Sequence, residues 1–195
     1  MLRAIWRCDG AATTMVTRLI GVPSRNDMLS LCCTKIVRER MGLPRSLPPP
    51  VEPTNRLGNW YVHLVRFGHQ QIVLATSERS LLTVLLPARR LRQSIEITFP
   101  AAVAGLLAAL QLPTRVVSRE LEAMHPISFT AASNRRVIGS MNEFAWQLGS
   151  YMTSTGDPLS LALQLSQTPM SAVGSKSSYG FPDALSRELL MSWNQ

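Results

Sequence analysis

The chain of 195 residues suits one domain, or one domain with a tail, and its 46% of hydrophobic residues exclude general disorder. It carries 20 Lys and Arg against 12 Asp and Glu, a formal net charge of +8, and the sequence pI is near 10.4. No window approaches the roughly 18 to 20 uninterrupted apolar residues of a membrane span, so we expect no membrane partner. Three cysteines are too few for a disulfide scaffold.

The basic side chains are concentrated in the first two thirds of the chain. Residues 1–136 hold 18 basic and 8 acidic side chains, whereas residues 137–195 hold 2 and 4. All but Lys35 and Lys176 of the basic residues are arginines, whose planar fork suits phosphates and carboxylates. A GC-rich genome would also favour arginine over lysine. The sign and location of the charge still favour an acidic partner, either nucleic acid or an acidic protein.

Residues 1–27 differ from the rest of the sequence. They hold four arginines and no sustained apolar period, and their apolar runs are too short for the core of a signal peptide. A transit peptide would be rich in arginine and poor in acidic residues, which this segment satisfies in part. Since Met28 is followed at once by a strand pattern, we predict a disordered extension or a misplaced start over 1–27 and a single domain over 28–195.

The first predicted elements are a strand, a helix and a strap. The strand covers 29–33, and the short helix 35–41 follows with Thr34 as its N-cap and Gly42 near its end. Residues 44–58 contain five of the 13 prolines. We expect them to form an extended strap across the surface.

Three strands joined by short turns come next. They are predicted at 60–67, 71–77 and 80–86. The turn lengths are typical of an antiparallel meander, and apolar residues on both faces indicate that both faces are covered. The remaining elements are helices over 101–110 and 114–124, a strand over 127–131, and helices over 133–151, 156–167 and 181–193. We therefore predict an α+β fold in which a small, mainly antiparallel sheet is covered by several helices.

Two predicted helices have distinctive patterns. Residues 101–110 follow Pro100 and are apolar nearly all round, which predicts a central helix. The helix over 133–151 has an apolar stripe that steps by four and three residues. This stripe comprises Val137, Met141, Phe144, Leu148 and Tyr151.

The start of the helix over 133–151 is a candidate anion site. Ser133 or Asn134 would cap the helix, and Arg135 and Arg136 fall in its first turn, where a basic side chain opposes the helix dipole. Free backbone N–H groups and arginines together would hold a phosphate or a carboxylate. A candidate polar cluster follows within three turns and comprises Ser140, Asn142 and Glu143. The alternatives are a close-packed helix with solvated arginines and a catalytic centre.

Three basic groups are candidates for binding an anion or nucleic acid. They are Lys35, Arg38, Arg40 and Arg45; Arg89, Arg90 and Arg92; and Arg135 and Arg136. Trp60 and Tyr61 would stack bases if exposed, or belong to the core. The sequence has no helix-turn-helix, zinc-finger or RNA-recognition signature.

Signals for catalysis, metals and cofactors are weak. The sequence contains no Gly-x-Ser-x-Gly elbow and no glycine-rich phosphate loop. Cys32 and Cys33 are adjacent, so in a strand they point to opposite faces, which is typical of small apolar residues in a reducing cytoplasm. We therefore expect no metal and no cofactor. A nuclease that uses His63 or His125 with Arg136 and Glu143 is an alternative.

Three blocks of sequence are similar to a known family. They are Cys33-Thr34-Lys35, then residues 58–61 (GNWY) with 76–87 (TSERSLLTVLLP), then residues 133–144 (SNRRVIGSMNEF). Their order and spacing resemble an uncharacterised bacterial family, the domain of unknown function DUF6933, over about residues 28–190. Members more often have a second lysine where this chain has Ile36, and a lysine before the Asn-Arg pair where it has 130–133 (TAAS).

The resemblance implies a cytoplasmic bacterial protein and, because some members are joined to plasmid-type reading frames, a link to mobile elements. We consider three functions. The first is a non-enzymatic binding module with an arginine-rich face for nucleic acid or another polyanion. The second is an enzyme that acts on a phosphorylated or nucleic-acid substrate through residues 134–143. The third is an interaction partner in a mobile-element or toxin–antitoxin-like system.

The interpretation of residues 1–27 predicts where the natural chain begins. We expect mass spectrometry of the protein from its native host to find an N-terminus at or near Met28. A native peptide that spans Arg18 to Arg25 would contradict this expectation.

Overall fold

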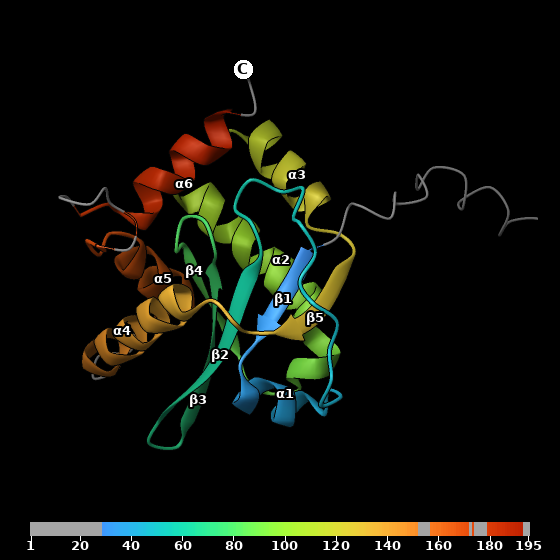
Figure 1. Ribbon diagram of the computed structural model, residues 1–195. Helices are drawn as coiled ribbons and strands as arrows, with labels where there is room; N and C mark the ends of the chain where they lie inside the picture. Colours follow the sequence, from blue (N-terminus) through green and yellow to red (C-terminus); the bar gives the residue numbers. More distant parts are fainter. Residues whose placement is uncertain (1–28, 152–156, 172, 174–178, 193–195) are drawn as a thin grey trace, which may run out of the picture.

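Figure 1 shows the computed structural model, which describes residues 29–151, 157–171, 173 and 179–192. The predicted extension over 1–27 lies outside the described residues. The strands are β1 (Leu29–Cys33), β2 (Trp60–Phe67), β3 (Gln70–Ser77), β4 (Thr83–Pro87) and β5 (Ile127–Ala131). The helices are α1 (Lys35–Met41), α2 (Leu91–Ala109), α3 (Thr114–Ala123), α4 (Arg135–Tyr151), α5 (Pro158–Ser166) and α6 (Pro182–Met191).

The five strands form one mixed sheet in the order β4-β3-β2-β1-β5. The pairs β2–β3 and β3–β4 are antiparallel, which confirms the predicted meander and the α+β class. The two further strands, β1 and β5, add two parallel pairs, because β1 runs parallel to both β2 and β5. Parallel neighbours need a long connection, and α1 with the strap over 44–58 supplies it between β1 and β2.

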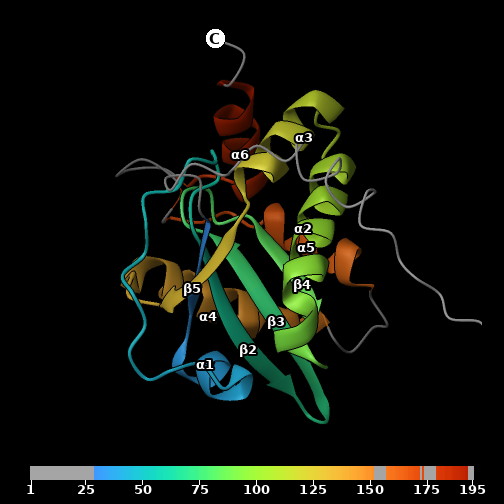
Figure 2. The same ribbon diagram turned by 90° about the vertical axis from the view of Figure 1, so that its right-hand side faces the viewer.

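Helices cover both faces of the sheet, and each face has its own core. Leu31 and Cys33 belong to the larger core, with side chains from α1, α2, α3 and α6, whereas Cys32 belongs to the core that α4 and α5 cover. Figures 1 and 2 show α2 and α4 on opposite sides of the sheet. The prediction that the two cysteines point to opposite faces is confirmed. The expected covering of both faces is confirmed as well.

Trp60 and Tyr61 are core residues, so they are not available to stack on a ligand. Trp60 is fully buried and packs edge-on against Phe99, with ring centroids 5.1 Å apart and an interplanar angle of 76°. Tyr61 is 2% exposed and points to the opposite core. Of the two interpretations of this aromatic pair, the structure supports the core.

Helix α2 begins ten residues earlier than predicted. Pro100 lies inside it, so the prediction that the helix starts after this residue was wrong. The buried side chains form one stripe along the helix: Leu91, Ile95, Phe99, Val103 and Leu106. Burial stabilises each large apolar side chain by about 1.5–3 kcal/mol, and the stripe thereby outweighs the roughly 3 kcal/mol that an interior proline costs. The prediction of a central helix that is covered on all sides was also wrong, because Ala101, Ala108 and Ala109 are exposed to solvent.

The strand predicted over 80–86 begins at Thr83. Residues 78–82 form a turn instead, in which the backbone N–H and the hydroxyl of Ser80 both donate to Ser77 Oγ, at 3.2 and 3.0 Å. Leu81 adopts the left-handed conformation, with φ of 60°. The longer turn brings Glu78 and Arg79 to the end of the sheet where β2 begins.

Helix α4 has the cap and the buried stripe that its sequence predicts. Asn134 Oδ1 accepts hydrogen bonds from the backbone N–H groups of Arg136 at 3.1 Å and Val137 at 3.4 Å. Val137, Met141, Phe144 and Leu148 are all buried. The side chain of Tyr151, the last predicted member of the stripe, lies outside the described residues. No helix in the described ranges combines the length and the hydrophobicity that crossing a membrane requires.

Thr34 precedes α1 at the predicted N-cap position, but its hydroxyl does not bond to the helix. Thr34 Oγ1 and His63 Nδ1 are hydrogen-bonded at 3.2 Å, which links the end of β1 to β2. Gly42 ends the helix in the left-handed conformation, with φ of 63°, as its position predicts. Burial lowers the pKa of His63 from its ordinary value of 6.5.

Because the pKa of His63 is lowered in the folded protein, we predict that the free energy of unfolding decreases as the pH falls. The unfolded chain binds a proton at His63 more readily than the folded chain does, so this stability is present above pH 6.5 and is lost as the pH falls through the lower folded pKa. We expect the wild type to lose more unfolding free energy than His63→Gln between about pH 7.5 and about pH 5, measured by urea denaturation.

The control is His69→Gln, which changes an exposed histidine in the β2–β3 turn. This variant should keep the pH dependence of the wild type. Identical pH profiles of the wild type and His63→Gln would contradict the prediction.

Candidate functional site

Two of the three predicted basic groups meet at one end of the molecule. Arg92, near the start of α2, donates from Nη1 to the carbonyl oxygens of Met41 at 2.9 Å and Gly42 at 3.2 Å. These carbonyls end α1, where a cation is favourable because of the helix dipole. The resulting α1–α2 basic surface comprises Lys35, Arg38, Arg40, Arg45, Arg89, Arg90 and Arg92.

Some side chains of the α1–α2 basic surface form hydrogen bonds or ion pairs with other described residues, and others do not. Arg38 donates from Nη1 to the carbonyl of Arg45 at 3.3 Å, so Arg38 and Arg92 both hold backbone in place. Lys35 pairs with Glu39 at 3.9 Å, but both side chains are largely exposed and such a pair contributes little. Arg92 stays exposed although it is held in this way, and Arg40, Arg45, Arg89 and Arg90 are exposed as well. These are the side chains most accessible to an anionic ligand.

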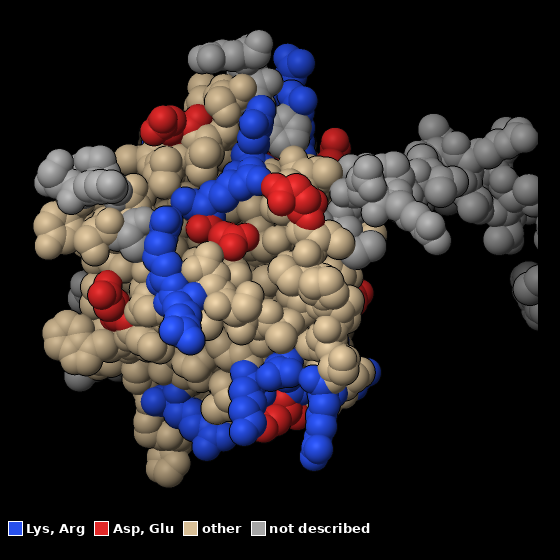
Figure 3. All heavy atoms as spheres, in the orientation of Figure 1, with Lys and Arg blue, Asp and Glu red and all other residues tan. Residues whose placement is uncertain are grey.

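The third predicted basic group lies apart from the α1–α2 basic surface. Arg135 and Arg136 are exposed in the first turn of α4, next to the Asn134 cap. Figure 3 shows Lys and Arg side chains in two bands on this face, one at its lower end over α1 and one that passes the start of α4. Of the three basic groups predicted from the sequence, the two at 35–45 and 89–92 therefore form one surface, and the group at 135–136 stays separate.

The predicted polar cluster on α4 is divided between core and solvent. Ser140 is buried, and its hydroxyl donates to the carbonyl of Arg136 at 3.2 Å. Asn142 and Glu143 are exposed. On an α-helix, Glu143 lies on the same face as Arg136 but about 10 Å farther along the axis, and Asn142 is turned about 120° from it. The cluster is thus spread over the helix surface, with its hydroxyl engaged by the backbone.

Glu78 is a central residue that sequence reasoning missed. Its Oε1 accepts a hydrogen bond from Asn134 Nδ2 at 3.2 Å and a long one from the Tyr61 hydroxyl at 3.5 Å. Burial raises the pKa of Tyr61, and the nearby Cys32 and Glu78 raise it further, so the phenol stays protonated and donates. One carboxylate thereby joins β2, the β3–β4 turn and the cap of α4.

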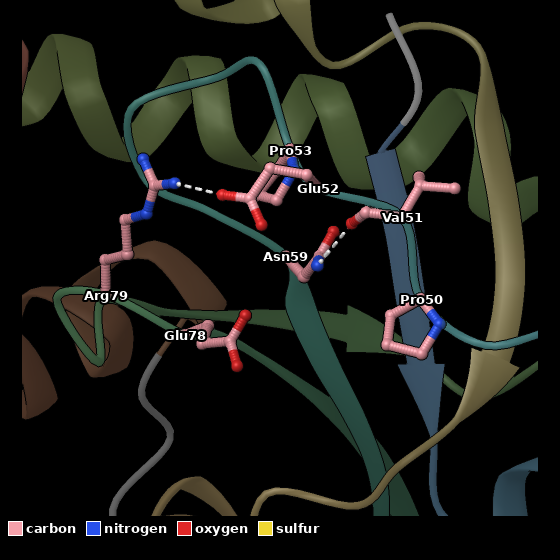
Figure 4. Close-up of a pocket in the computed structure, with 7 residues that line it drawn as sticks. All are labelled: Pro50, Val51, Glu52, Pro53, Asn59, Glu78 and Arg79. Atoms are coloured by element: carbon pink, nitrogen blue, oxygen red, sulfur yellow. Dashed lines mark hydrogen bonds and ion pairs between the residues drawn. The ribbon is translucent and has the colours of Figure 1, made fainter. Parts of the chain in front are cut away.

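A hollow opens beside Glu78, with a volume of about 280 Å³. Figure 4 shows its lining, in which residues 50–53 of the strap face Asn59, Glu78 and Arg79. We call this space the Glu78 hollow. Arg79 Nη2 and Glu52 Oε1 are 3.5 Å apart at its rim, and the Glu52 side chain is 92% exposed. The hollow therefore combines two carboxylates, one guanidinium and the apolar rings of Pro50 and Pro53.

Asn59 holds the strap against the sheet. Its Oδ1 accepts from the backbone N–H of Ser30, and its Nδ2 donates to the carbonyl of Val51, both at 3.0 Å. The Val51 N–H in turn donates to Ser30 Oγ at 3.1 Å. These bonds fix the wall of the Glu78 hollow that the strap provides.

A buried carboxylate on α3 fixes the end of the strap. Glu120 is fully buried and accepts from Asn55 Nδ2 at 3.0 Å and from the N–H groups of Arg56 and Leu57, both at 2.9 Å. Burial raises the pKa of Glu120, and these hydrogen bonds oppose that change. The turn that Glu120 holds leads directly into Asn59.

The thiols of β1 and the predicted histidines lie outside the hollow. Burial raises the pKa of the Cys33 thiol to about 12, and burial also raises that of Cys32, so both stay protonated and unreactive near neutral pH. His63 bonds to Thr34, and His125 is exposed before β5. In the described part of the chain, no group of three or more His, Cys, Asp or Glu is placed to hold a metal ion.

The blocks that meet at Glu78 belong to a known family. The family model Domain of unknown function (DUF6933) matches residues 30–185. The chain belongs to the DUF6933 family. Comparison with curated proteins and with solved structures finds no match. Tyr61, Glu78 and Asn134 lie in the three segments that resemble this family, 58–61, 76–87 and 133–144. Their position in these segments was the sequence signal that could have identified Glu78 as a site residue.

The hydrogen bonds of Glu120 predict that Glu120→Gln destabilises this DUF6933 protein. The amide nitrogen would face an N–H donor of the 55–57 turn and leave it unpaired, which costs about 1–3 kcal/mol. Urea denaturation should show this loss of unfolding free energy.

The matched control is Glu122→Gln, which changes an exposed carboxylate on the same helix. Its unfolding free energy should stay within about 0.5 kcal/mol of the wild type. A Glu120→Gln variant as stable as this control would disprove the anchoring role.

Proposed function

We propose that this DUF6933 protein is a non-enzymatic module that binds nucleic acid through its arginine-bearing face. The observation that carries the proposal is the meeting of two basic segments, 35–45 and 89–92, which Arg92 joins by its bonds to Met41 and Gly42. Phosphates spaced along a polyanion would meet several cations at once there. Each phosphate contact releases counterions and adds to the affinity.

The one ion pair that the structure gives within these two described segments is weak. Lys35 pairs with Glu39 at 3.9 Å, and both side chains are largely exposed. Arg40, Arg45 and Arg89 are exposed. The positive potential is therefore available to steer an anionic partner, in keeping with the net charge of +8.

An exposed tryptophan on α4 favours a single strand over a duplex. Trp146 is 77% exposed, although tryptophan is usually buried. On the helix it lies within about 20° of Arg135 and about 16 Å farther along the axis. A base stacked on the indole, with phosphates on the first turn of α4, is a common mode of single-strand binding.

The enzyme and interaction hypotheses have less support in the geometry. The Ser140 hydroxyl is buried on its own helix, and Asn142 and Glu143 face solvent. Trp146 would also serve a protein partner, so the nucleic-acid experiment distinguishes these uses. The location in the bacterial cytoplasm and the link to mobile elements belong to the same proposal and rest on the resemblance to the family.

The proposal predicts a strong salt dependence that two arginines control. We expect a fluorescent single strand of about 12 nucleotides to bind the full chain, with log K falling linearly against log salt between about 50 and about 300 mM. Arg40→Gln with Arg89→Gln should reduce the slope by about 1.4, because each lost single-strand contact removes about 0.7. Fluorescence anisotropy measures both quantities.

The control removes the same charge from the opposite end of the molecule. Arg115→Gln with Arg187→Gln changes exposed residues of α3 and α6 and should reduce the slope by less than Arg40→Gln with Arg89→Gln does. Trp146→Ala should weaken binding with the slope intact, because stacking releases no counterions. Salt-independent binding, or equal slopes for the two double variants, would count against the proposal.

A further inference from the structure

The two oxygens of the Glu78 carboxylate differ in their partners: the protein donates hydrogen bonds to Oε1, and Oε2 is available to a ligand. Oε1 accepts the bonds from Asn134 and Tyr61, which come from two different elements. Within the described part of the chain, Oε2 has no hydrogen-bond partner, and Glu78 lines the hollow. The long bond from Tyr61 also leaves Oε1 capacity for a further donor. A ligand in the hollow thus meets an acceptor pair that is already oriented.

The chemistry of this acceptor pair selects among the nucleobases. An ionised carboxylate accepts hydrogen bonds and donates none. On its Watson–Crick edge, guanine presents two adjacent donors, N1–H and the N2 amino group. Adenine, cytosine and uracil each place an acceptor beside their donor, and that acceptor would face the carboxylate. Unstacked bases in single strands are commonly read on this edge.

Arg79 favours a nucleotide over a basic peptide in the same hollow. Its guanidinium lines the hollow beside Glu78 and would repel an arginine or lysine side chain of a partner. A phosphate would instead be attracted to it. Arg79 Nη1 donates to the backbone carbonyls of Asn55 at 3.2 Å and Arg56 at 3.4 Å, which hold the side chain in place. Its Nη2 pairs with Glu52 at 3.5 Å, and a phosphate can replace this exposed pair at low cost. A carboxylate and a guanidinium that line the same hollow match a ligand with both donors and a phosphate.

The size and the wall of the hollow suit one base. Its volume of about 280 Å³ lies just below the range of about 300–1,000 Å³ that is typical of small-ligand sites, as expected for a ligand as small as one base. Pro50 and Pro53 supply apolar rings, and Asn59 holds the strap that carries them. The wall is thereby formed before a ligand arrives.

We infer that the Glu78 hollow takes up an unstacked guanine of a bound single strand, with Glu78 accepting from N1–H and N2–H and Arg79 contacting a phosphate. This inference rests on the proposed function and adds base selectivity to it. Arg135 and Arg136 directly follow Asn134, whose side chain donates to Glu78, so the chain brings two further arginines near the hollow.

The test compares single bases within one oligonucleotide. The full chain is titrated with an oligouridylate of about 12 nucleotides that carries guanine, inosine or adenine at one central position. We expect guanine to bind about tenfold more tightly than inosine, which lacks the N2 amino group. Glu78→Gln should lower this ratio to about one, because its amide replaces an acceptor with a donor.

Glu78→Gln keeps an oxygen for Tyr61 and Asn134, and thermal unfolding checks that it folds. The control Glu122→Gln removes the same charge at an exposed site on α3 and should keep the guanine preference. If Glu78→Gln fails to fold, the wild type alone provides the test. Equal affinities of the wild type for the guanine and inosine oligonucleotides would then overturn the inference.

The outcomes separate this inference from the proposed function. Salt-dependent binding of every oligonucleotide with equal affinity overturns the guanine site and leaves the proposed function standing. No binding of any oligonucleotide overturns the proposed function, and the guanine site with it. Binding of the peptide acetyl-Gly-Arg-Gly-amide that depends on Glu78, without a guanine preference, assigns the hollow to a protein partner and also overturns the inference.

Discussion

The fully buried carboxylate of Glu120 is the constraint on which the functional face depends. A buried charge is tolerated only where hydrogen bonds replace its water, and here the 55–57 turn of the strap supplies them. Fixing this turn fixes Asn59, which holds the strap against Ser30, and the strap forms one wall of the Glu78 hollow. A helix on one side of the sheet thus determines the geometry of a site at its end.

The arginines have two different roles in this fold. Arg38 and Arg92 donate to backbone carbonyls and hold the α1–α2 corner together, while Arg40 and Arg89 stay in solvent. The structural pair therefore brings the exposed pair onto one surface. A high count of arginines does not distinguish these roles, because both occur in the same short segments of the sequence.

Local patterns predicted the elements well and their meeting points poorly. The stripe of α4 and the meander follow from residue periodicity, and both are confirmed. The start of α2 was missed because Pro100 ends helices more often than it is packed within them. Glu78 was missed because its partners are 17 and 56 residues away, and Arg92 reaches 51 residues back to Met41. Such pairings depend on the sheet order, which spacing alone does not encode.

The position of β1 between β2 and β5 has a consequence for how the chain folds during its synthesis. Its two neighbours pair with it in register as Leu31 with Trp60 and Leu29 with Ile127. During synthesis the meander over 60–87 emerges long before β5, so β1 keeps an unpaired edge until residue 131 has left the ribosome. Completing the sheet then requires closure of a long loop, which is typical of slower folding. The newly made chain is thus most exposed to wrong strand pairing along the edge that β5 later covers.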